Sequence, residues 1–519
     1  MTDSGRRLLP SVASSLFWNA TLLPVVTFIN LGASILIRRT FGLESGVYDV
    51  LVGISSTLLA YSSLGLPGTL PRFILDLEAT VGMWPTVAFV RRVALLRMGL
   101  FVIPLLLLNA MTARVSAAFQ LGEHGAFLLH AVTVLALGRA ALDLADRTLH
   151  GLMAHRASNV IRGLQGVAVL VLVVAIRRWE GGIGALVIGT GAIALVAASL
   201  GGHVALGLAR SSDKRQLGPD PVRQSGEFSP GLSVGRFWNF ALLLYFGTVS
   251  GYFSGAGFAS ATLGIVSDGV EAVTLFNTGH QIPLMVSVVL LGGFQGLYVP
   301  LFGRLISTPD RLRTGYQEVI KVYAILLIPA GAGLLVMLGD YIPLLYGQAF
   351  SPAVPIARIL TVVIFVIAFL GLGGIVLTAA ELSRPVASAQ MLLVLGAVPF
   401  VLAASTGDLV LTAMIFPAGR LLASGAKHLI ARRRFELRFP VAFVARVTLP
   451  SLVMIAVLIP SRSFLGTSWL EAILLTVVGA AVAVIGMRMI RVLGPRELDL
   501  LERAELPGAR VLVRLARGR

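Results

Sequence analysis

Residues 17–39 read FWNATLLPVVTFINLGASILIRR, an apolar run that ends in two arginines. A run of this length can cross a bilayer as one helix, which takes about 20 residues. Similar runs recur along the chain and predict about fourteen crossings, hence an all-α, polytopic transmembrane helix bundle. The predicted crossings lie at residues 17–37, 48–68, 93–110, 124–142, 160–177, 183–207, 234–257, 273–299, 319–339, 354–379, 386–404, 408–429, 442–460 and 469–488.

Basic residues fall almost entirely on alternate connections between these runs. With the N-terminus placed in the cytoplasm, 35 of the 42 Lys and Arg residues lie on the cytoplasmic side. Basic residues near helix ends are retained on that side, so the bias predicts the orientation and supports the count of crossings. Both termini are therefore expected in the cytoplasm, in a multi-pass protein of the inner, cytoplasmic membrane. The seven basic residues assigned to the outer side are Arg38, Arg39, Arg114, Arg177, Arg178, Arg358 and Arg462.

The composition excludes a soluble globular protein. The 519 residues are 56% hydrophobic and 13% charged, with a mean hydropathy of +0.88, whereas soluble domains carry about 25% charged residues. The net charge of +17 does not indicate nucleic acid, because the excess lies in membrane-flanking loops and the C-terminal tail, where anionic membrane lipids are the expected partner. The chain has no cysteine and no spacing typical of a metal motif, so no metal, cofactor or catalytic residue is predicted.

Polar breaks divide the chain into lobes. One break follows six predicted crossings and contains Pro and Gly, and a basic run follows twelve. Two similar bundles joined by a cytoplasmic linker are a plan of alternating-access carriers, so we expect two six-helix lobes with a pseudo-two-fold relation. The predicted parts are an N-terminal lobe at 1–209, a cytoplasmic linker at 210–232, a C-terminal lobe at 233–430, a basic loop with two extra helices at 431–490, and a basic cytoplasmic tail at 491–519.

Three stretches at the ends of predicted helices carry a family pattern. Residues 32–48 read GASILIRRTFGLESGVY, residues 64–73 read LGLPGTLPRF, and residues 344–360 read LLYGQAFSPAVPIARIL. In their order and their place along the helices they resemble the MOP exporter superfamily, and within it the polysaccharide and lipid-linked oligosaccharide flippases, over about residues 10–430. The resemblance implies a lipid-linked glycan carried between two six-helix lobes, with no covalent chemistry.

Such a flippase needs a polar cavity with cations for phosphate, and charges inside a membrane usually face a cavity because they are costly elsewhere. The first predicted helix carries Thr27, Asn30, Ser34 and Arg38 at spacings of 3, 4 and 4 residues, which places them on one face. This polar stripe suits a cavity wall with a phosphate-binding cation at its outer end. The structural alternative is hydrogen bonding between helices, with an arginine at the membrane interface.

Further candidates come from the helices around the second lobe's start. Tyrosine and amide groups suit sugar hydroxyls, whereas polar contacts that only hold helices together are the alternative. Arg72 follows a stretch rich in Pro and Gly and either meets the headgroup at the cytoplasmic entrance or anchors the helix at the interface. The candidates on the predicted helices 234–257 and 273–299 are Asn239, Tyr245, Tyr252, Asn277, Gln281 and Gln295.

Charges near the fourth crossing and the distribution of acids bear on the alternatives. Arg139, Asp143 and Arg147 recur at every fourth position and are predicted to form ion pairs at the cytoplasmic end of that helix. All 25 Asp and Glu residues are expected in loops or at helix ends. Drug exporters of the same superfamily use carboxylates buried in the membrane, so this distribution argues against a drug or cation antiporter.

The predicted function is translocation of a polyprenyl-phosphate-linked oligosaccharide across the cytoplasmic membrane by alternating access, for surface polysaccharide or envelope glycan synthesis. Two alternatives stay open. One is a multidrug or cation antiporter of the same superfamily, and the other is an integral-membrane glycosyltransferase or polymerase, which needs outward-facing acids or a large outer loop. The expected partners are the lipid-linked glycan, anionic membrane lipids, and a polysaccharide polymerase or glycosyltransferases, with no nucleic acid.

Overall fold

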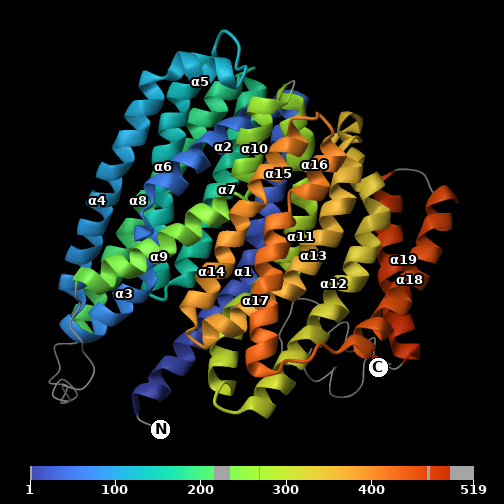
Figure 1. Cartoon of the computed structure of the whole chain (residues 1–519). Helices are drawn as coiled ribbons and strands as arrows, with labels where there is room; N and C mark the ends of the chain where they lie inside the picture. The colour runs from blue at the N-terminus through green and yellow to red at the C-terminus, as the bar shows by residue number, and fades with distance from the viewer. Residues whose placement is uncertain (1–2, 216–233, 268, 465–467, 491, 493–519) are drawn as a thin grey trace. The chain divides into compact units, whose positions relative to one another are not determined.

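A computed structural model of the chain describes residues 3–215, 234–267, 269–464, 468–490 and 492. Within these residues the chain forms helices joined by short turns, and no β-strand is present among them (Figure 1). The predicted all-α fold is confirmed. The chain divides into two compact units, which we call unit 1 (Met1–Val273) and unit 2 (Thr274–Arg519).

Unit 1 is held together by helices that approach one another at small residues. α6 packs along α8, and α7 packs on both α1 and α8. A Cβ at Gly138 of α6 would lie only 2.3 Å from the carbonyl oxygen of Gly191 in α8. Such close packing holds helices together in lipid, where the hydrophobic force between them is absent. The helices are α1 (Asp3–Phe41), η1 (Gly42–Glu44), α2 (Ser45–Ser62), α3 (Leu66–Val81), α4 (Met83–Ala110), α5 (Thr112–Ala118), α6 (Gly125–Gly151), α7 (His155–Arg178), α8 (Ile183–Arg215), α9 (Val234–Tyr252) and α10 (Ala256–Val266).

Unit 2 combines a helix bundle with a C-terminal helix pair. α13 packs on α17, and α12 packs on α18, which in turn packs on α19. Buried apolar side chains of α12, α18 and α19, such as Met337, Met454 and Leu475, form one shared core. The helices are α11 (Val270–Leu305), α12 (Pro309–Tyr346), η3 (Gln348–Phe350), α13 (Ala353–Ala379), α14 (Ser383–Leu395), α15 (Ala397–Ala404), α16 (Leu409–Ile415), α17 (Ala418–Phe435), α18 (Val441–Phe464) and α19 (Trp469–Met489).

Twelve helical stretches among the described residues are long and apolar enough to cross a membrane. One of them, Thr21–Ser62, has 42 residues, which is about twice the length that one crossing needs. It contains the C-terminal half of α1 and the whole of α2. The helices α9 and α10 form a further candidate, bent by 48°. Each of the fourteen predicted ranges overlaps one of these stretches or the bent pair, so the chain is a multi-pass membrane protein.

The turn between α2 and α3 requires a glycine. Gly65 has φ +72°, in the left-handed region that favours glycine. A Cβ at this position would lie 1.9 Å from the carbonyl oxygen of Ala241 in α9. The turn therefore brings α9 against the start of α3, where Phe73 also stacks edge-on against Phe237.

The helices α9 and α10 belong to unit 1 by their contacts, although the predicted linker at residues 210–232 would place them in the second lobe. α10 packs on α2, and the Tyr252 hydroxyl lies 2.5 Å from the Thr57 hydroxyl. Most of the predicted linker, from residue 216 on, and residues 493–519 of the predicted tail lie outside the described residues.

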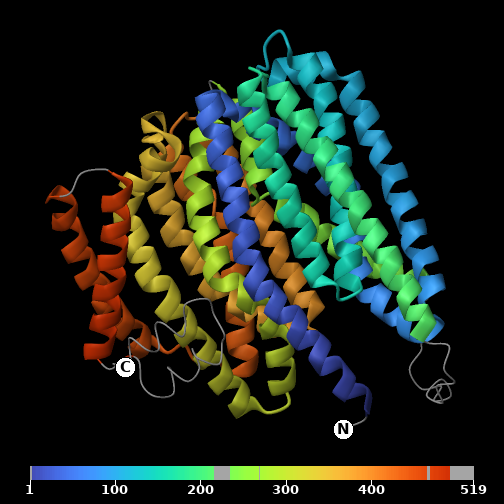
Figure 2. The same cartoon turned by 180° about the vertical axis from the view of Figure 1, so that it is seen from behind.

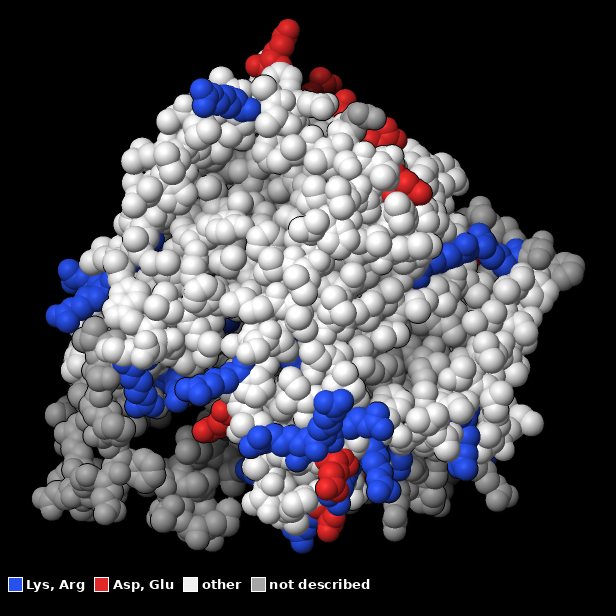
Figure 3. Space-filling view, viewed as in Figure 1, with Lys and Arg blue, Asp and Glu red and all other residues white. Residues whose placement is uncertain are grey.

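The surfaces of both units suit a lipid environment. On the face drawn in Figure 3, wide areas carry neither basic nor acidic side chains. Many fully apolar residues are exposed, for example Leu106 and Val171 in unit 1 and Leu402 in unit 2. In Figure 2, which views the chain from behind, α1 (dark blue) is seen along most of its length. Exposed apolar side chains on this scale are expected where helices face hydrocarbon.

Candidate functional site

Unit 1 contains a cavity of about 710 Å³ whose wall combines charged and uncharged polar side chains. Residues from α1, α2, α3, α4, α6, α7 and α9 line it. Four arginines and two aspartates give the wall a formal net charge of +2. These six residues are Arg97, Arg139, Asp143, Asp146, Arg147 and Arg162.

Four of the six charged residues come from one helix. Arg139, Asp143 and Arg147 follow one another at intervals of four residues in α6, and Asp146 lies beside them. This spacing keeps them on one side of the helix. α6 also packs against α8 and α3, which its glycines Gly138 and Gly151 approach closely. The sequence of α6 thus places its ionised face toward the cavity.

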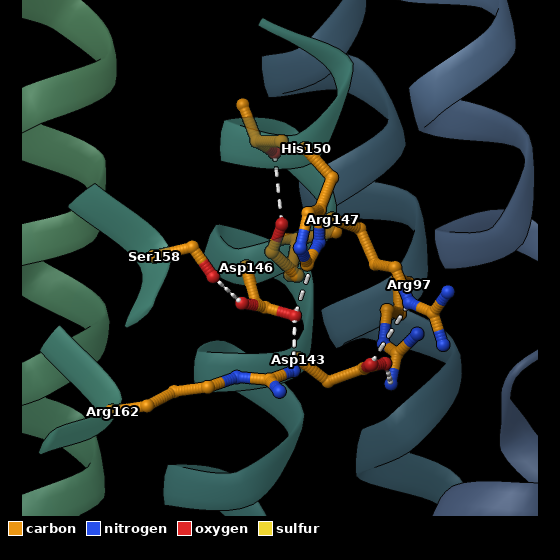
Figure 4. Close-up of polar contacts among 9 residues, drawn as sticks. Arg97, Asp143, Asp146, Arg147, His150, Ser158 and Arg162 are labelled. Atoms are coloured by element: carbon orange, nitrogen blue, oxygen red, sulfur yellow. Dashed lines mark hydrogen bonds and ion pairs between the residues drawn. The ribbon is translucent and has the colours of Figure 1, made fainter. Parts of the chain in front are cut away.

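Asp143 forms ion pairs with arginines on two helices, as Figure 4 shows. Its Oδ2 accepts from Nη2 of Arg97 in α4 at 3.0 Å. Its Oδ1 accepts from Nε of Arg147, one turn further along α6, at 3.4 Å. The side chain of Asp143 is 38% exposed, whereas that of Arg97 is 3% exposed. Asp143 therefore joins a deeply buried guanidinium group of the cavity wall to a more exposed one.

Asp146 is held more tightly and faces α7 (Figure 4). It accepts a hydrogen bond from the buried Ser158 hydroxyl and a charge-assisted bond from Arg162 Nη2 at 2.5 Å. Nδ1 of His150 lies 3.4 Å from its Oδ2. Because the side chain of Asp146 is only 6% exposed, these contacts compensate a carboxylate that would otherwise be costly to bury.

Arg139 links α6 to α2. Its Nη1 donates to the backbone carbonyl of Val52 at 3.0 Å and to the Ser56 hydroxyl at 3.1 Å. Both of these acceptors are neutral groups, and neither is an anion. Arg139 therefore contributes a fixed positive charge to the wall of the cavity.

Arg97 keeps one unused donor. Its Nη1 is buried and has no hydrogen-bond partner among the described residues, while Nη2 is bonded to Asp143. A buried donor without a partner costs free energy, which a ligand that accepts from it can recover. A guanidinium group offers parallel donors that match the oxygens of a phosphate group. This arrangement is suited to binding an anion.

Three residues predicted from the sequence line the same cavity. Thr27 and Asn30 do so from α1, and Tyr252 does so from the end of α9. Arg38 lies elsewhere: its side chain is 4% exposed and its Nη2 bonds Asp49 Oδ2 at 3.0 Å. Ser34 is not among the residues that line the cavity. A substrate-binding role for these residues remains a prediction.

Two other predicted residues share a second, smaller hollow of unit 1. Arg72 and Asn239 line a hollow of about 580 Å³ between α3 and α9. The guanidinium carbon of Arg72 lies 4.9 Å from the centre of the Phe240 ring. Tyr245, one turn further along α9, donates from its hydroxyl to the backbone carbonyl of Tyr61 at 3.1 Å. Arg72 of α3 and the two α9 residues Asn239 and Tyr245 thus lie where α9 packs on α2 and α3.

The three remaining candidates lie on α11 in unit 2. Gln281 accepts a hydrogen bond from the Tyr346 hydroxyl at 3.4 Å. Neither Asn277 nor Gln281 lines the apolar cavity of about 420 Å³ between α11, α12, α18 and α19. Gln295 lies in α11, but its side chain is outside the described residues. The structure thus does not gather all the predicted residues in one place.

The structure corrects the expected placement of the acids. The fourth crossing was expected to end at residue 142, but α6 continues to Gly151, so Asp143 lies two turns inside a helix. Asp340 likewise lies inside α12, with its side chain 4% exposed and paired to Arg462. Expecting every acid in a loop or at a helix end was therefore wrong. Arginines on neighbouring helices make these positions tolerable, and such partners are not adjacent in the sequence.

None of the six charged residues of the cavity wall was predicted as a site residue. Arg139, Asp143 and Arg147 were predicted only as ion-pair partners. Arg97 stands alone within the apolar stretch VALLRMGLF at residues 93–101, and a lone charge inside a membrane helix is a signal for a cavity. From the sequence, Arg97 is counted only among the 35 basic residues of the cytoplasmic side. Among the described residues no group of three His, Cys, Asp or Glu comes together that could hold a metal ion.

Comparison of the sequence with known proteins gives two short matches. Residues 264–355 match the family model described as polysaccharide biosynthesis protein, a region that contains the segment LLYGQAF at residues 344–350. Over 88 residues the chain is 23% identical to the lipopolysaccharide biosynthesis protein WzxC of Escherichia coli (strain K12). This second match spans 17% of the chain and 18% of WzxC.

Comparison of the fold gives matches over most of the chain. A structure of the lipid II flippase MurJ in an inward closed conformation has a TM-score of 0.62 and 9% identity, covering 90% of this chain and 97% of that one. An inward-facing multidrug resistance MATE family transporter of the MOP superfamily has a TM-score of 0.53 and 14% identity, with coverages of 82% and 98%. A MOP superfamily transporter from Pyrococcus furiosus has a TM-score of 0.52 and 17% identity, with coverages of 82% and 95%.

The structural similarity establishes a shared fold. Sequence identities this low leave the substrate open. Three observations point to the same superfamily. They are the motifs in residues 32–73 and 344–360, the match to the polysaccharide biosynthesis model, and the common fold. The chain is a multi-pass membrane protein with the fold of MOP superfamily transporters, and its predicted resemblance to the polysaccharide flippases of that superfamily is confirmed.

Proposed function

We propose that the chain is a flippase that moves a polyprenyl-phosphate-linked oligosaccharide across the cytoplasmic membrane for surface polysaccharide or envelope glycan synthesis. The observation that carries this proposal is the cationic cavity of unit 1, with the unused donor of the buried Arg97. The protein acts as a carrier and makes or breaks no covalent bond.

The cavity offers groups for both parts of a lipid-linked headgroup. Its net charge of +2 suits a phosphate or pyrophosphate group, which otherwise has to leave water without compensation. Thr27, Asn30, Gln165 and Tyr252 add hydroxyl and amide groups for sugar hydroxyls. The volume of about 710 Å³ lies in the range of sites that enclose a ligand of a few sugar rings or less. A longer glycan would extend beyond the cavity.

The lipid chain does not need to enter the polar cavity. The helices of unit 1 expose apolar side chains such as Leu106 and Val171, which suits contact with hydrocarbon. A headgroup in the cavity and a chain in the bilayer would let the substrate cross while only its polar part is transferred. Opening alternates between the two faces of the membrane, driven by ligands that bind the two states unequally.

The remaining parts of the proposal concern orientation and partners. The predicted concentration of basic residues on one side supports an orientation with both termini in the cytoplasm. Anionic lipids then contact the basic connections. A polysaccharide polymerase and glycosyltransferases are proposed as the proteins that use and supply the substrate.

Complementation of a strain that lacks this chain tests the proposal. Wild type is compared with Arg97→Gln and with Arg91→Gln, which removes the same charge from an exposed position of α4 outside the cavity. We expect surface glycan to return with wild type and R91Q and to stay absent with R97Q, at equal amounts of protein in the membrane. Normal surface glycan with R97Q would overturn the role of the cavity.

A second candidate is an antiporter for organic cations, because Asp143 and Asp146 lie in the wall of the cavity. Both carboxylates are paired with arginines, and the net positive charge repels a cationic substrate. The same strains distinguish the two functions. Loss of drug resistance with unchanged surface glycan would favour the antiporter.

A further inference from the structure

Asp143 bridges two arginines that differ strongly in exposure. Arg97 lies in α4 with a side chain that is 3% exposed, and Arg147 lies in α6 with a side chain that is 49% exposed. Each arginine bonds a different oxygen of the carboxylate. Asp143 can therefore release Arg97 without losing its other partner, which is four residues along its own helix.

Asp146 has no such freedom. It is bonded to Ser158 and Arg162 of α7 and lies beside His150, and its side chain is 6% exposed. Moving it would leave the buried Ser158 hydroxyl without its acceptor and Arg162 without its counter-ion. The two carboxylates of the cavity thus differ in their freedom to move. Asp146 is buried and held by its partners, whereas Asp143 is partly exposed and paired with two arginines.

We propose that Arg97 is the phosphate subsite of the cavity and that Asp143 is its exchangeable counter-ion. A phosphate group of the ligand takes the place of Asp143 on Arg97, and Asp143 remains paired with Arg147. This inference rests on the proposed function and assigns the substrate's phosphate to one arginine.

The exchange keeps the buried guanidinium compensated throughout. While the site is empty, Asp143 neutralises Arg97 through Nη2, and Nη1 has no partner among the described residues. When a phosphate group binds, both nitrogens can donate to its oxygens in a bidentate arrangement. Arg97 therefore gains a bond that Asp143 does not supply. When Asp143 returns, it competes with the ligand and favours release, which a carrier needs at the end of each cycle.

Binding measurements on the purified full-length protein test the exchange. Calorimetry compares wild type with Asp143→Asn and Asp146→Asn, using inorganic pyrophosphate and farnesyl pyrophosphate as the two probes. Both substitutions remove one negative charge from the same cavity, but only the first removes the competitor. We expect D143N to bind about tenfold more tightly than wild type, which corresponds to about 1.4 kcal/mol, and D146N to tighten binding clearly less.

A second pair of variants keeps the test valid where a buried substitution prevents folding. Arg147→Gln removes the half-exposed partner that receives Asp143, so Asp143 stays on Arg97 and pyrophosphate binds several-fold more weakly. Arg91→Gln removes the same charge from an exposed position of α4 and is expected to leave binding unchanged.

The outcomes separate the inference from the proposed function. Unchanged or weaker binding by D143N, equal tightening by D143N and D146N, or unchanged binding by R147Q would each overturn the exchange. Tightening with farnesyl pyrophosphate assigns the subsite to a lipid-linked phosphate, and tightening confined to inorganic pyrophosphate assigns it to a free phosphate. Failure of wild type to bind either probe, together with normal surface glycan from R97Q, would instead remove the proposed function.

Discussion

At the scale of single residues, the cavity depends on how each charge is compensated. Arg97 is almost completely buried, and the bond that it makes to Asp143 leaves Nη1 unused. Replacing a buried ionic group with an apolar side chain of similar volume is often neutral for stability. Removing one partner and leaving the other buried is costly. The fate of the partner therefore decides whether a substitution affects stability or function.

For Arg97→Met we expect loss of function with little loss of stability. Asp143 keeps Arg147 as a partner and is partly exposed, so the free energy of unfolding should change by less than about 1 kcal/mol. Thermal unfolding in detergent and complementation of the deletion strain measure the two effects. A large fall in melting temperature would show that Arg97 is mainly structural.

For Asp146→Ala we expect the opposite balance. The buried Ser158 hydroxyl loses its acceptor and Arg162 loses its counter-ion, which should cost about 1–3 kcal/mol. The lower part of this range applies if water reaches Arg162, whose side chain is 43% exposed. Thermal unfolding of D146A beside D143A provides the comparison, and equal stability of the two variants would contradict the distinction between a fixed and an exchangeable carboxylate.

At the scale of helices and turns, the sequence predicted most of what was found. Long apolar runs identify membrane helices because lipid leaves the backbone no other way to satisfy its hydrogen bonds. Three features escaped: the bend between α9 and α10, the extension of α6 to Gly151, and the association of α9 and α10 with unit 1. All three depend on partners far away in the chain, such as Thr57 for Tyr252.

The candidate site was also only partly predictable, because its residues depend on partners far away in the chain. The polar stripe of α1 was recognised by its spacing, and Thr27 and Asn30 line the cavity. Arg38 shares the stripe but is paired with Asp49, because the next helix begins beside its end. Arg97 was overlooked because one charge in an apolar run has no periodicity. Its importance appears only when α4 and α6 are placed side by side.

The turn at Gly65 offers a test at this scale. For Gly65→Ala we expect a loss of several kcal/mol, because the added Cβ meets the Ala241 carbonyl at 1.9 Å and a left-handed backbone alone costs a non-glycine residue about 1–2 kcal/mol. Gly42→Ala is the matched control, since Gly42 also has a positive φ but its Cβ would meet nothing within 4 Å. Equal destabilisation of the two variants would argue against a close approach of α9 to this turn.

The contact between α18 and α12 offers another test at the scale of helices. Nε and Nη2 of Arg462 in α18 bond Oδ1 of Asp340 in α12 at 2.9 and 2.8 Å, and Asp340 is 4% exposed. Arg462→Gln should cost about 3 kcal/mol, because it leaves a buried carboxylate without a charged partner. Adding Asp340→Asn should restore much of this loss. Additive losses in the double variant would show that the two side chains do not interact.

At the scale of the whole molecule, fold and function rest on different evidence. The fold of MOP superfamily transporters follows from structural similarity over 90% of the chain to MurJ and 82% to a MATE transporter. One fold serves several substrates, so the function has to be argued from the site. The site in unit 1 is cationic and polar, and this favours a phosphate-bearing headgroup over an organic cation.

The most direct test of the central claim follows the substrate itself. Cells without this chain are lipid-extracted, and polyprenyl-linked oligosaccharide is quantified, with its membrane side determined by an impermeant reagent that modifies sugars. In a strain without a second flippase, we predict that complete lipid-linked units accumulate on the cytoplasmic face and that surface polymer is lost. Unchanged amounts of the lipid-linked glycan on both faces would contradict the account.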